Sequence, residues 1–327
     1  MNTSVKYLGI QLKTPIIVGS CGLTGNLDNI LRMQDAGAGA VIIKTKFEEE
    51  FAYDIKHNTT TLARTEIYGE AYDYVESIHH GYQMDDYFAE LNKITEAVSI
   101  PVLGSINCIS LESWLNYVKN YELVGCKAIE LNMAMRPYDI LTTASDVERT
   151  FSQVLQTIKR VTSLPVAIKL GSCFTDMARF IQQLSWSGVQ SITLFDTDVW
   201  MAMDIENIRY APMPIEHHIE DLDSTLRWIS ILSKKTRGTL SAATGIDNGD
   251  DVIKALLAGA STTQVSSSLY RHGIEHITTM QKALEQWMQR HNFETIEQFV
   301  GLLAMKGADN ASARMRIHAI KSLFEEE

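Results

Sequence analysis

The sequence of 327 residues predicts a (β/α)₈ barrel, and three observations support this fold class. Short apolar runs recur along the chain, and amphipathic patterns typical of helices lie between them. Two kinds of run alternate, one preceded by proline and the other by glycine with a small residue. Eight such units in this length favour a closed parallel barrel, with an open doubly wound sheet as the alternative.

Seven of the eight runs fall into two groups that alternate in sequence order, and the eighth lies near the end. Those with proline before the run are TPIIVGSCG from Thr14, SIPVLGSIN from Ser99 and SLPVAIKLG from Ser163. Those with glycine before the run are AGAGAVIIKT from Ala36, VGCKAIELNM from Val124, SGVQSITLFD from Ser187 and AGASTTQVSS from Ala258. GTLSAATG, from Gly238, completes the set.

Helical patterns occupy residues 111–125, 146–162, 176–188 and 250–260, with glycine placed where each of several helices would end. At the start, VKYLGIQLK has a glycine at its centre and predicts a small β-hairpin that closes the bottom of the barrel. We expect residues 1–327 to form a single domain.

Two long insertions interrupt the repeat, residues 46–84 after the second strand and residues 197–221 after the sixth. Long loops on the carboxyl face of a barrel are where lids and substrate walls are built. The alternative is that each insertion is a solvated excursion without a role.

Charge and composition restrict the classes of partner. The formal net charge of -11 and the lack of a Lys/Arg run argue against nucleic acid. No stretch reaches the roughly 18 apolar residues that span a membrane, and no charged leader is apparent, so we expect a soluble cytoplasmic protein. The four cysteines show no CxxC spacing, so reduced thiols are expected and a zinc site is not.

In a barrel of this kind the carboxyl ends of the strands hold the chemistry. We therefore expect a small-molecule site built from polar and small residues at those ends. These residues are Ser20, Gly22, Lys44, Asn107, Asn132, Lys169, Asp196, Gly245, Ser266 and Ser267.

The last two strand ends predict a phosphate site. The loops AATGIDNG and VSSSLYRHG offer a glycine for close backbone approach and three consecutive hydroxyls. Because three aspartates follow Gly245, we place the phosphate against Gly245 and the N–H groups of residues 266–268. In the alternative interpretation the serines cap the next helix and the glycine only forms a turn.

Alternation along a strand places Glu130 on the same side as Asn132, inside the barrel. A buried charge is costly unless it is paired, so Glu130 is expected to form an ion pair with Lys169 or Lys44. The lysine that does not pair with Glu130 is then available for a role in catalysis.

The chain resembles the FMN-dependent dihydroorotate dehydrogenases from about Tyr7 to Gly273. The resemblance rests on Ser-x-Gly after the first strand, Lys-Thr after the second, Ser-x-Asn after the third, Glu-Leu-Asn after the fourth, Pro-Val-x-x-Lys-Leu at the fifth, and the Leu-Tyr tail. The segments 226–232 and 283–289 are similar to a branch usually called dihydroorotate dehydrogenase-like. The resemblance implies an FMN-containing (β/α)₈ barrel, pyrimidine metabolism, and a homodimer.

The resemblance also implies roles for individual residues. Lys44 would lie near flavin and substrate, and Lys169 would lie against the N1 and O2 edge of the flavin ring, where a cation stabilises reduced flavin. Ser20 and Gly22 would approach the ring and ribityl chain. Asn107 and Asn132 would supply amide hydrogen bonds, and Gly245, Ser266 and Ser267 would hold the phosphate.

Two positions depart from the family. Where the family has a catalytic Cys or Ser, this chain has Met135, and a thioether has no proton to exchange. After the sixth strand the related branch reads Phe-Asn-Arg, but this chain reads Phe-Asp-Thr from Phe195, and Asp196 would repel a substrate carboxylate. Both departures argue against dihydroorotate as the substrate.

Other groups could replace the missing base. Asp196 is the strongest replacement because it lies where a substrate contact is expected. Cys21, Cys108 and Cys173 follow strand ends, but a free cysteine is most often a small buried hydrophobe. Tyr138 and the histidine pairs 79–80 and 217–218 lie in candidate loops, and no metal site is expected.

Three functions remain open. The first, which we favour, is an FMN-dependent oxidoreductase that acts on a C–C bond of a small polar, pyrimidine-like metabolite, with Lys44, Asn132 and Asp196 as catalytic residues. The second is a flavin-binding protein that has lost dihydroorotate oxidation because of Met135. The third is a flavin-free lyase that uses Lys169 or Lys44 as a Schiff-base nucleophile.

Overall fold

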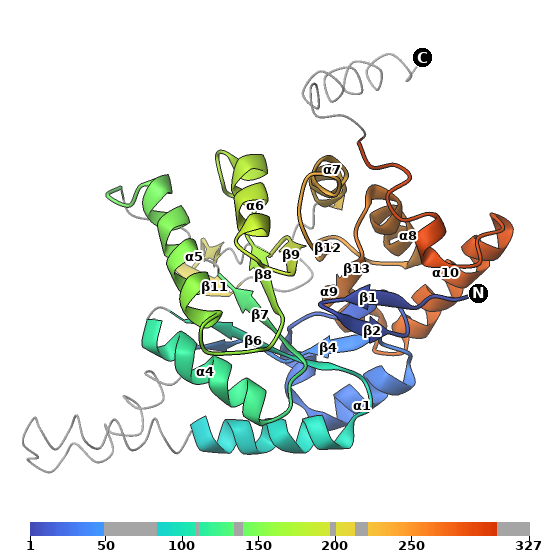
Figure 1. Ribbon diagram of the computed structural model, residues 1–327. Coiled ribbons are helices and arrows are strands. Elements are labelled where there is room, and N and C mark those ends of the chain that lie inside the picture. Colours follow the sequence, from blue (N-terminus) through green and yellow to red (C-terminus); the bar gives the residue numbers. More distant parts are fainter. Residues whose placement is uncertain (49–83, 109–110, 134–139, 197–200, 213–221, 306–327) are drawn as a thin grey trace, which may run out of the picture.

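The computed structural model describes residues 1–48, 84–108, 111–133, 140–196, 201–212 and 222–305. Its centre is a ring of eight parallel strands, which confirms the predicted (β/α)₈ barrel (Figure 1). Pairing of β4 with β6 closes the ring and excludes the open doubly wound sheet. The barrel strands are β3 (Ile16–Val18), β4 (Ala40–Ile42), β6 (Val102–Asn107), β7 (Ala128–Asn132), β8 (Val166–Leu170), β9 (Ser191–Leu194), β12 (Thr239–Ala242) and β13 (Thr262–Val265).

Helices follow the barrel strands and pack around them, so both faces of the strands are buried. This explains why the strands read as near-continuous apolar runs rather than alternating ones. The helices lie close to the predicted ranges where a range was predicted. They are α1 (Leu27–Asp35), residues 84–97, α4 (Leu111–Leu123), α5 (Ala144–Ile158), α6 (Met177–Trp186), α7 (Leu222–Leu232), α8 (Gly249–Ala258), α9 (Ser267–His272) and α10 (His276–Arg290), with short 3₁₀ turns η1 (Gly22–Gly25) and η3 (Ile296–Gln298).

Helix α5 shows how local sequence sets an element. Thr143 accepts a hydrogen bond from the Asp146 N–H, and the Asp146 carboxylate accepts one from the Thr143 N–H, which forms a capping box. Val147, Phe151 and Val154 then recur at helical spacing and are buried against the barrel. The start of the helix and its inner face are therefore both encoded locally.

A hairpin of β1 (Val5–Tyr7) and β2 (Ile10–Leu12) closes the amino-terminal end of the barrel, as predicted. Leu8 and Gly9 form its turn with positive φ angles of 52° and 79°. Tyr7 is fully buried, and burial together with the Glu130 carboxyl raises the pKa of its phenol. Since Glu130 lies in the barrel interior, the hairpin plugs the barrel from below.

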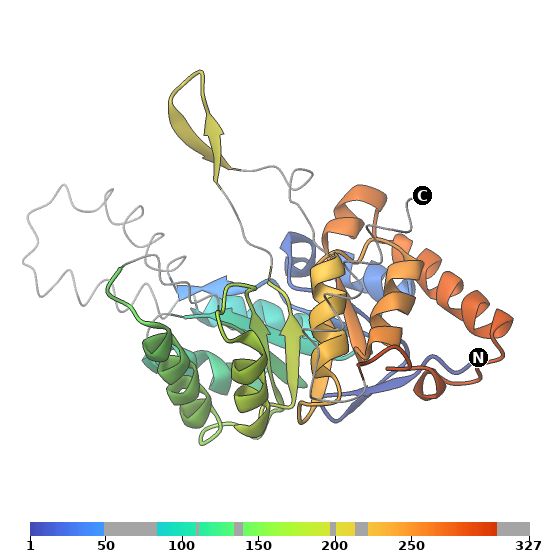
Figure 2. The same ribbon diagram turned by 90° about the horizontal axis from the view of Figure 1, so that it is seen from above.

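Only parts of the two insertions belong to the described residues. The first insertion contributes β5 (Lys46–Phe47), which pairs with β6. The second contributes a hairpin of β10 (Met201–Asp204) and β11 (Arg209–Pro212), which projects from the side of the barrel opposite to β1 and β2 (Figure 2). The lid or wall role expected of residues 49–83, 197–200 and 213–221 lies outside the described residues.

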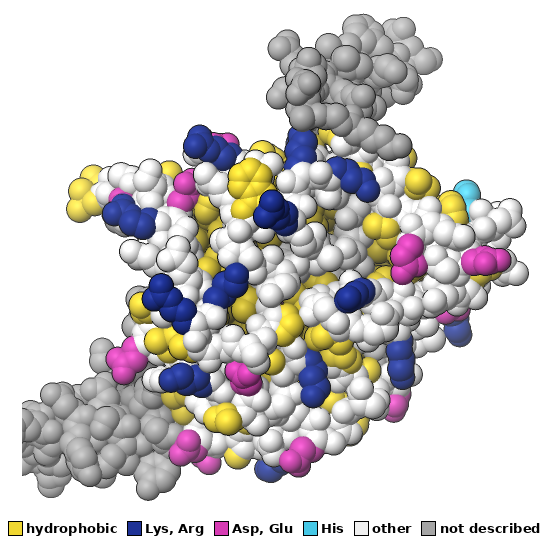
Figure 3. Space-filling view, in the orientation of Figure 1, with side chains coloured by type: hydrophobic (Ala, Val, Ile, Leu, Met, Phe, Trp, Pro, Cys, Tyr) yellow, Lys and Arg dark blue, Asp and Glu magenta, His cyan; other side chains and the backbone are white. Residues whose placement is uncertain are grey.

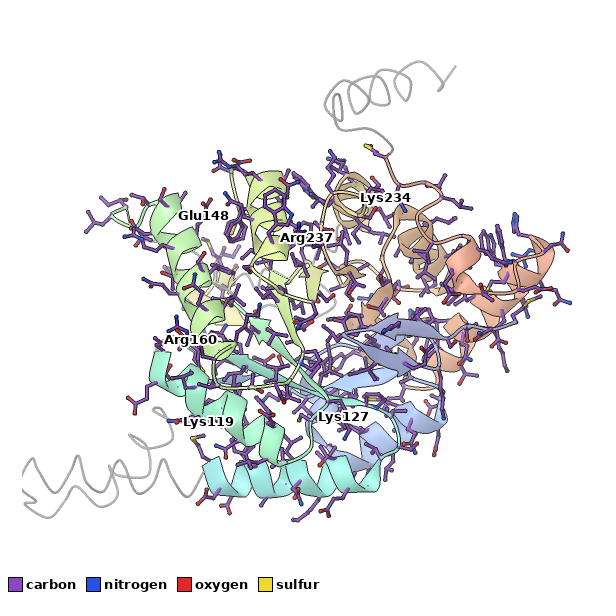
Figure 4. The ribbon with its side chains drawn as sticks, in the orientation of Figure 1. Lys119, Lys127, Glu148, Arg160, Lys234 and Arg237 are labelled. Atoms are coloured by element: carbon purple, nitrogen blue, oxygen red, sulfur yellow. The ribbon has the colours of Figure 1, made fainter. Side chains whose placement is uncertain are left out.

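The amino-terminal face carries charges of both signs. Figure 3 shows Lys and Arg side chains spread over this face, with Asp and Glu side chains among them. Figure 4 labels five of these basic residues, which come from helices and from the segments that lead into strands: Lys119, Lys127, Arg160, Lys234 and Arg237.

Among the described residues, no helix has both the length and the apolar character needed to cross a membrane.

Candidate active site

A cavity of about 370 Å³ lies at the carboxyl ends of the barrel strands. This volume falls within the range of small-molecule pockets. Ser20 and Gly22, which follow β3, and Lys44, which follows β4, line the cavity as predicted. Lys44 is exposed. It therefore lies where a ligand can reach it from solvent.

Hydroxyl groups join the first three strand ends. Ser20 Oγ accepts a hydrogen bond from the Thr45 N–H at 2.7 Å and lies 2.7 Å from Thr45 Oγ1. Thr45 Oγ1 also lies 2.7 Å from Ser105 Oγ in β6. This chain of hydrogen bonds fixes the loops on that side of the cavity, so a ligand meets a preformed wall.

Asn132, Lys169 and Asp196 meet on the other side of the cavity. Strand register pairs Asn132 of β7 with Lys169 of β8. The Asp196 N–H donates to the Leu170 carbonyl at 2.6 Å, which carries Asp196 alongside the end of β8. As a result Lys169 Nζ lies 3.2 Å from Asp196 Oδ1, with 13% and 17% of the two side chains exposed.

This ion pair determines the charge state of Lys169. Burial alone would lower the pKa of the ammonium group, but the carboxylates of Asp196 and Glu130 outweigh burial and raise it. The structure corrects the expected pairing, because the described partner of Lys169 is Asp196, and Glu130 acts on Lys169 without an ion-pair contact. Lys169 is thus held as a cation beside a carboxylate.

Glu130 lies in the barrel interior, fully buried, and burial raises the pKa of its carboxyl. Its Oε2 accepts hydrogen bonds from Gln264 Nε2 at 2.6 Å and from Thr193 Oγ1 at 2.7 Å. These contacts connect β7, β9 and β13 across the barrel. The alternation that predicted an inward Glu130 is confirmed. The charge of Lys169 and the hydrogen bonds from Thr193 and Gln264 offset part of the cost of burying its carboxyl.

Ser266 and Ser267, which follow β13, line the cavity from the last strand end. Ser266 precedes α9 but makes no side-chain capping bond to that helix. The neighbouring Ser268 is buried, and its Oγ has no hydrogen-bond partner among the described residues. The helix-capping interpretation therefore does not account for Ser266 or Ser268.

Asn107 and Gly245 are not among the residues that line the cavity. Gly245 has a φ of +84°, and a Cβ there would lie 2.6 Å from the backbone nitrogen of Leu222 at the start of α7. Close approach of α7 thus explains why this position is glycine. Contacts of Asn107 and Gly245 with a cofactor remain predictions.

Several lining residues were not singled out from the sequence. Gln264 lies within β13, two residues before the strand-end serines, and alternation places it on the inward side. Tyr270 of α9 reaches back to the β3 loop, where its hydroxyl accepts from the Leu23 N–H at 3.2 Å. Phe47 and Ile246 supply apolar walls. Alternation could have found Gln264, whereas no sequence signal indicates the reach of Tyr270.

The four cysteines all lie within the described residues, and none of them forms a disulfide. Cys21 lines the cavity, whereas Cys108 and Cys126 are buried and Cys173 is exposed. Met135, Tyr138 and the histidine pairs lie outside the described residues. Within the described ranges, no cluster of three or more His, Cys, Asp or Glu residues could hold a metal ion.

Comparison with known proteins gives consistent matches. The chain matches the family model described as dihydroorotate dehydrogenase over residues 2–288. The catalytic subunit of dihydroorotate dehydrogenase B (NAD(+)) from Thermoplasma acidophilum is 25% identical over 309 residues, covering 91% of this chain and 98% of that protein. The same subunit from Methanocaldococcus jannaschii is 25% identical over 310 residues, covering 90% and 95%. Chloroplastic dihydropyrimidine dehydrogenase (NADP(+)) from Arabidopsis thaliana is 23% identical over 326 residues, covering 91% and 76%.

Proposed function

Because the chain belongs to the dihydroorotate dehydrogenase family, we propose that it uses FMN to oxidise or reduce a C–C bond of a small polar, pyrimidine-like metabolite. The family and the matched relatives are dehydrogenases, so the chain is an oxidoreductase by family. The observation that carries the proposal is the mostly buried Lys169 cation in a cavity at the carboxyl ends of the strands.

The residues present fit FMN at both ends of the cavity. At one end, Ser266 and Ser267 offer hydroxyl and N–H donors suited to a phosphate, and Ser266 is not engaged in capping α9. At the other end Lys169 offers a fixed positive charge suited to the electron-rich edge of a flavin. When bound, FMN would supply the hydride chemistry that no side chain of the cavity can supply.

The protein side chains would bind and orient the substrate. Asn132 is buried at the cavity and can exchange amide hydrogen bonds with a polar ring. Lys44 is exposed at the cavity and can donate to a carbonyl oxygen or donate a proton to a substrate atom. Asp196 places a carboxylate at the cavity, where it can accept a proton from a substrate atom.

A Schiff-base lyase is the weaker candidate. A lysine nucleophile must lose its proton, and neighbouring carboxylates that raise the pKa of Lys169 oppose this loss. A flavin-binding protein without turnover is supported by the two departures from the family, Met135 and Asp196. A homodimer, which the family resemblance implies, remains a prediction.

A second substrate class deserves testing beside dihydroorotate. The Arabidopsis thaliana relative is named for dihydropyrimidines, which share the ring of dihydroorotate. Asp196 favours a ring without a carboxylate, because two negative charges in an enclosed site repel each other. We therefore include dihydrouracil among the candidate reductants.

The test is an anaerobic visible spectrum of protein reconstituted with FMN, recorded before and after adding dihydroorotate or dihydrouracil. Bleaching of the flavin bands by either compound supports the proposed oxidoreductase and shows that a base other than Met135 is used. Bound flavin that no dihydropyrimidine bleaches, but that dithionite reduces, indicates the flavin-binding protein without turnover. Protein that binds no FMN, but is trapped on lysine by borohydride with a carbonyl compound, indicates the lyase.

A further inference from the structure

A carboxylate pairs with the positive charge of Lys169 in the cavity wall. Lys169 would attract a ligand carboxylate if it stood alone, but Asp196 lies 3.2 Å from its ammonium group. A carboxylate entering the cavity therefore meets a cation that already has an anionic partner. The attraction that a lone buried lysine would provide is offset by repulsion from Asp196.

The other charges near the cavity do not restore that attraction. Glu130 is fully buried and acts electrostatically on Lys169 from the barrel interior, so any negative charge it carries also disfavours an anion. Lys44 is the remaining charged side chain of the described cavity lining. It is exposed, so solvent and salt screen its attraction for a ligand.

Two neutral side chains of the cavity lining hold oxygen atoms without donors. Gln264 Nε2 donates to Glu130 Oε2, which directs its Oε1 away from Glu130, and this Oε1 has no hydrogen-bond partner among the described residues. Asn132 Oδ1 also has no partner there. Both oxygens are enclosed by protein and not exposed in the cavity, so they give a ligand no attraction that would offset Asp196.

We propose that Asp196 is a specificity-determining residue, which makes the cavity prefer an uncharged ring over the same ring bearing a carboxylate. This inference rests on the proposed function, since it concerns the substrate of the FMN-loaded protein. It names the substrate class as a neutral pyrimidine-like ring, and it assigns the discrimination to the pairing of Asp196 with Lys169.

The first experiment uses the wild-type protein loaded with FMN and two ligands of nearly equal shape. Binding of orotate and of its neutral amide is measured by calorimetry and by perturbation of the flavin spectrum. We expect the amide to bind about tenfold more tightly than the carboxylate, because a like charge in an enclosed site costs on the order of a kcal/mol or more. Uracil should bind with an affinity close to that of the amide.

The second experiment changes Asp196. Asp196→Asn keeps the shape but removes the negative charge, and we expect orotate affinity to rise about tenfold relative to the amide. Asp196→Glu retains the charge and should retain the preference. Asp35→Asn, an exposed position at the end of α1, is the matched control for net charge and should leave the ligand ratio unchanged.

The outcomes separate the two levels of inference. Failure of the wild-type protein to bind FMN overturns the proposed function and, with it, this inference. Bound FMN with orotate preferred over its amide, or with neither ring bound, overturns the specificity inference alone. A preference that persists in Asp196→Asn also overturns it, because the discrimination then has another origin. Loss of the preference in Asp196→Asn, with retention in Asp196→Glu and Asp35→Asn, supports it.

Discussion

Lys169 Nζ lies 3.2 Å from Asp196 Oδ1 in the wall of the cavity at the carboxyl ends of the strands. The two residues end neighbouring strands, and the hydrogen bond from the Asp196 N–H to the Leu170 carbonyl holds them together. Both side chains are mostly buried, so their attraction is only weakly screened. The pair therefore links barrel stability to the electrostatics of the site.

The first prediction concerns the stability of this pair. Lys169→Gln or Asp196→Asn alone should destabilise the protein, because each leaves a mostly buried charge without its partner. The double variant should be less destabilised than the sum of the two, with a coupling energy of about 1–3 kcal/mol. Urea unfolding of the four proteins measures this coupling. Additive effects of the two substitutions would show that the contact contributes no coupling.

The second prediction concerns Glu130 and pH. Because the folded-state pKa of Glu130 is raised above 4.5, the folded protein binds a proton more tightly than the unfolded chain. Its contribution to stability is therefore complete below pH 4.5 and is lost as pH rises through the folded-state pKa. Glu130→Gln cannot titrate, so the difference in unfolding free energy, wild type minus variant, should fall as pH rises. A difference that rises with pH contradicts the assignment.

The third prediction concerns Gly22. A Cβ at this position would lie 2.7 Å from the Tyr270 hydroxyl, so Gly22→Ala must displace that side chain. We expect a loss of about 1 kcal/mol of stability and weaker FMN binding. Tyr270→Phe removes the clashing oxygen and should restore most of both losses in the double variant. Thermal unfolding and FMN fluorescence titration measure them. If Tyr270→Phe gives no rescue, the contact does not explain the glycine.

The fourth prediction concerns thiol reactivity. Cys173 is exposed and should be alkylated first by iodoacetamide near neutral pH. Burial raises the pKa of Cys126 to about 12 and raises that of Cys21, so both should react slowly. Since Cys21 lines the cavity, FMN should slow its labelling further and leave Cys173 unaffected. Peptide mass mapping with and without FMN reads out each site. Equal labelling of Cys21 in both samples would place the flavin elsewhere.

The sequence supports the barrel well because its signals are local. Proline or glycine before each apolar run marks the strand start, and the periodicity of the intervening segments predicts helices. Because the strands are buried on both faces and there are eight strand–helix units, a closed barrel is the expected compact arrangement. The strand ends follow directly, which is why Ser20, Lys44, Asn132 and Lys169 were expected to converge on one cavity.

The pairing within the site could not be predicted in the same way. The inward charge of Glu130 needs a partner, which predicted an ion pair with a lysine. Instead, the strand register and the hydrogen bond from the Asp196 N–H to the Leu170 carbonyl bring Asp196 next to Lys169. From the sequence, Gly245 is predicted to bind a phosphate. The structure instead explains this glycine by the close approach of α7 to its backbone, which depends on packing between segments distant in the sequence. The Tyr270 hydroxyl contacts the loop after β3 because α9 directs this side chain toward that loop. Such contacts depend on tertiary geometry, which local patterns do not encode.

The most direct test of the central claim is the FMN content of the purified protein after reconstitution, measured from the visible flavin bands. We predict one FMN per chain. Ser266→Asp, which places a carboxylate against the phosphate, should weaken binding at least about tenfold. The exposed Asp35→Asn control should bind FMN as the wild type does. A folded wild-type protein that takes up no FMN would contradict the account.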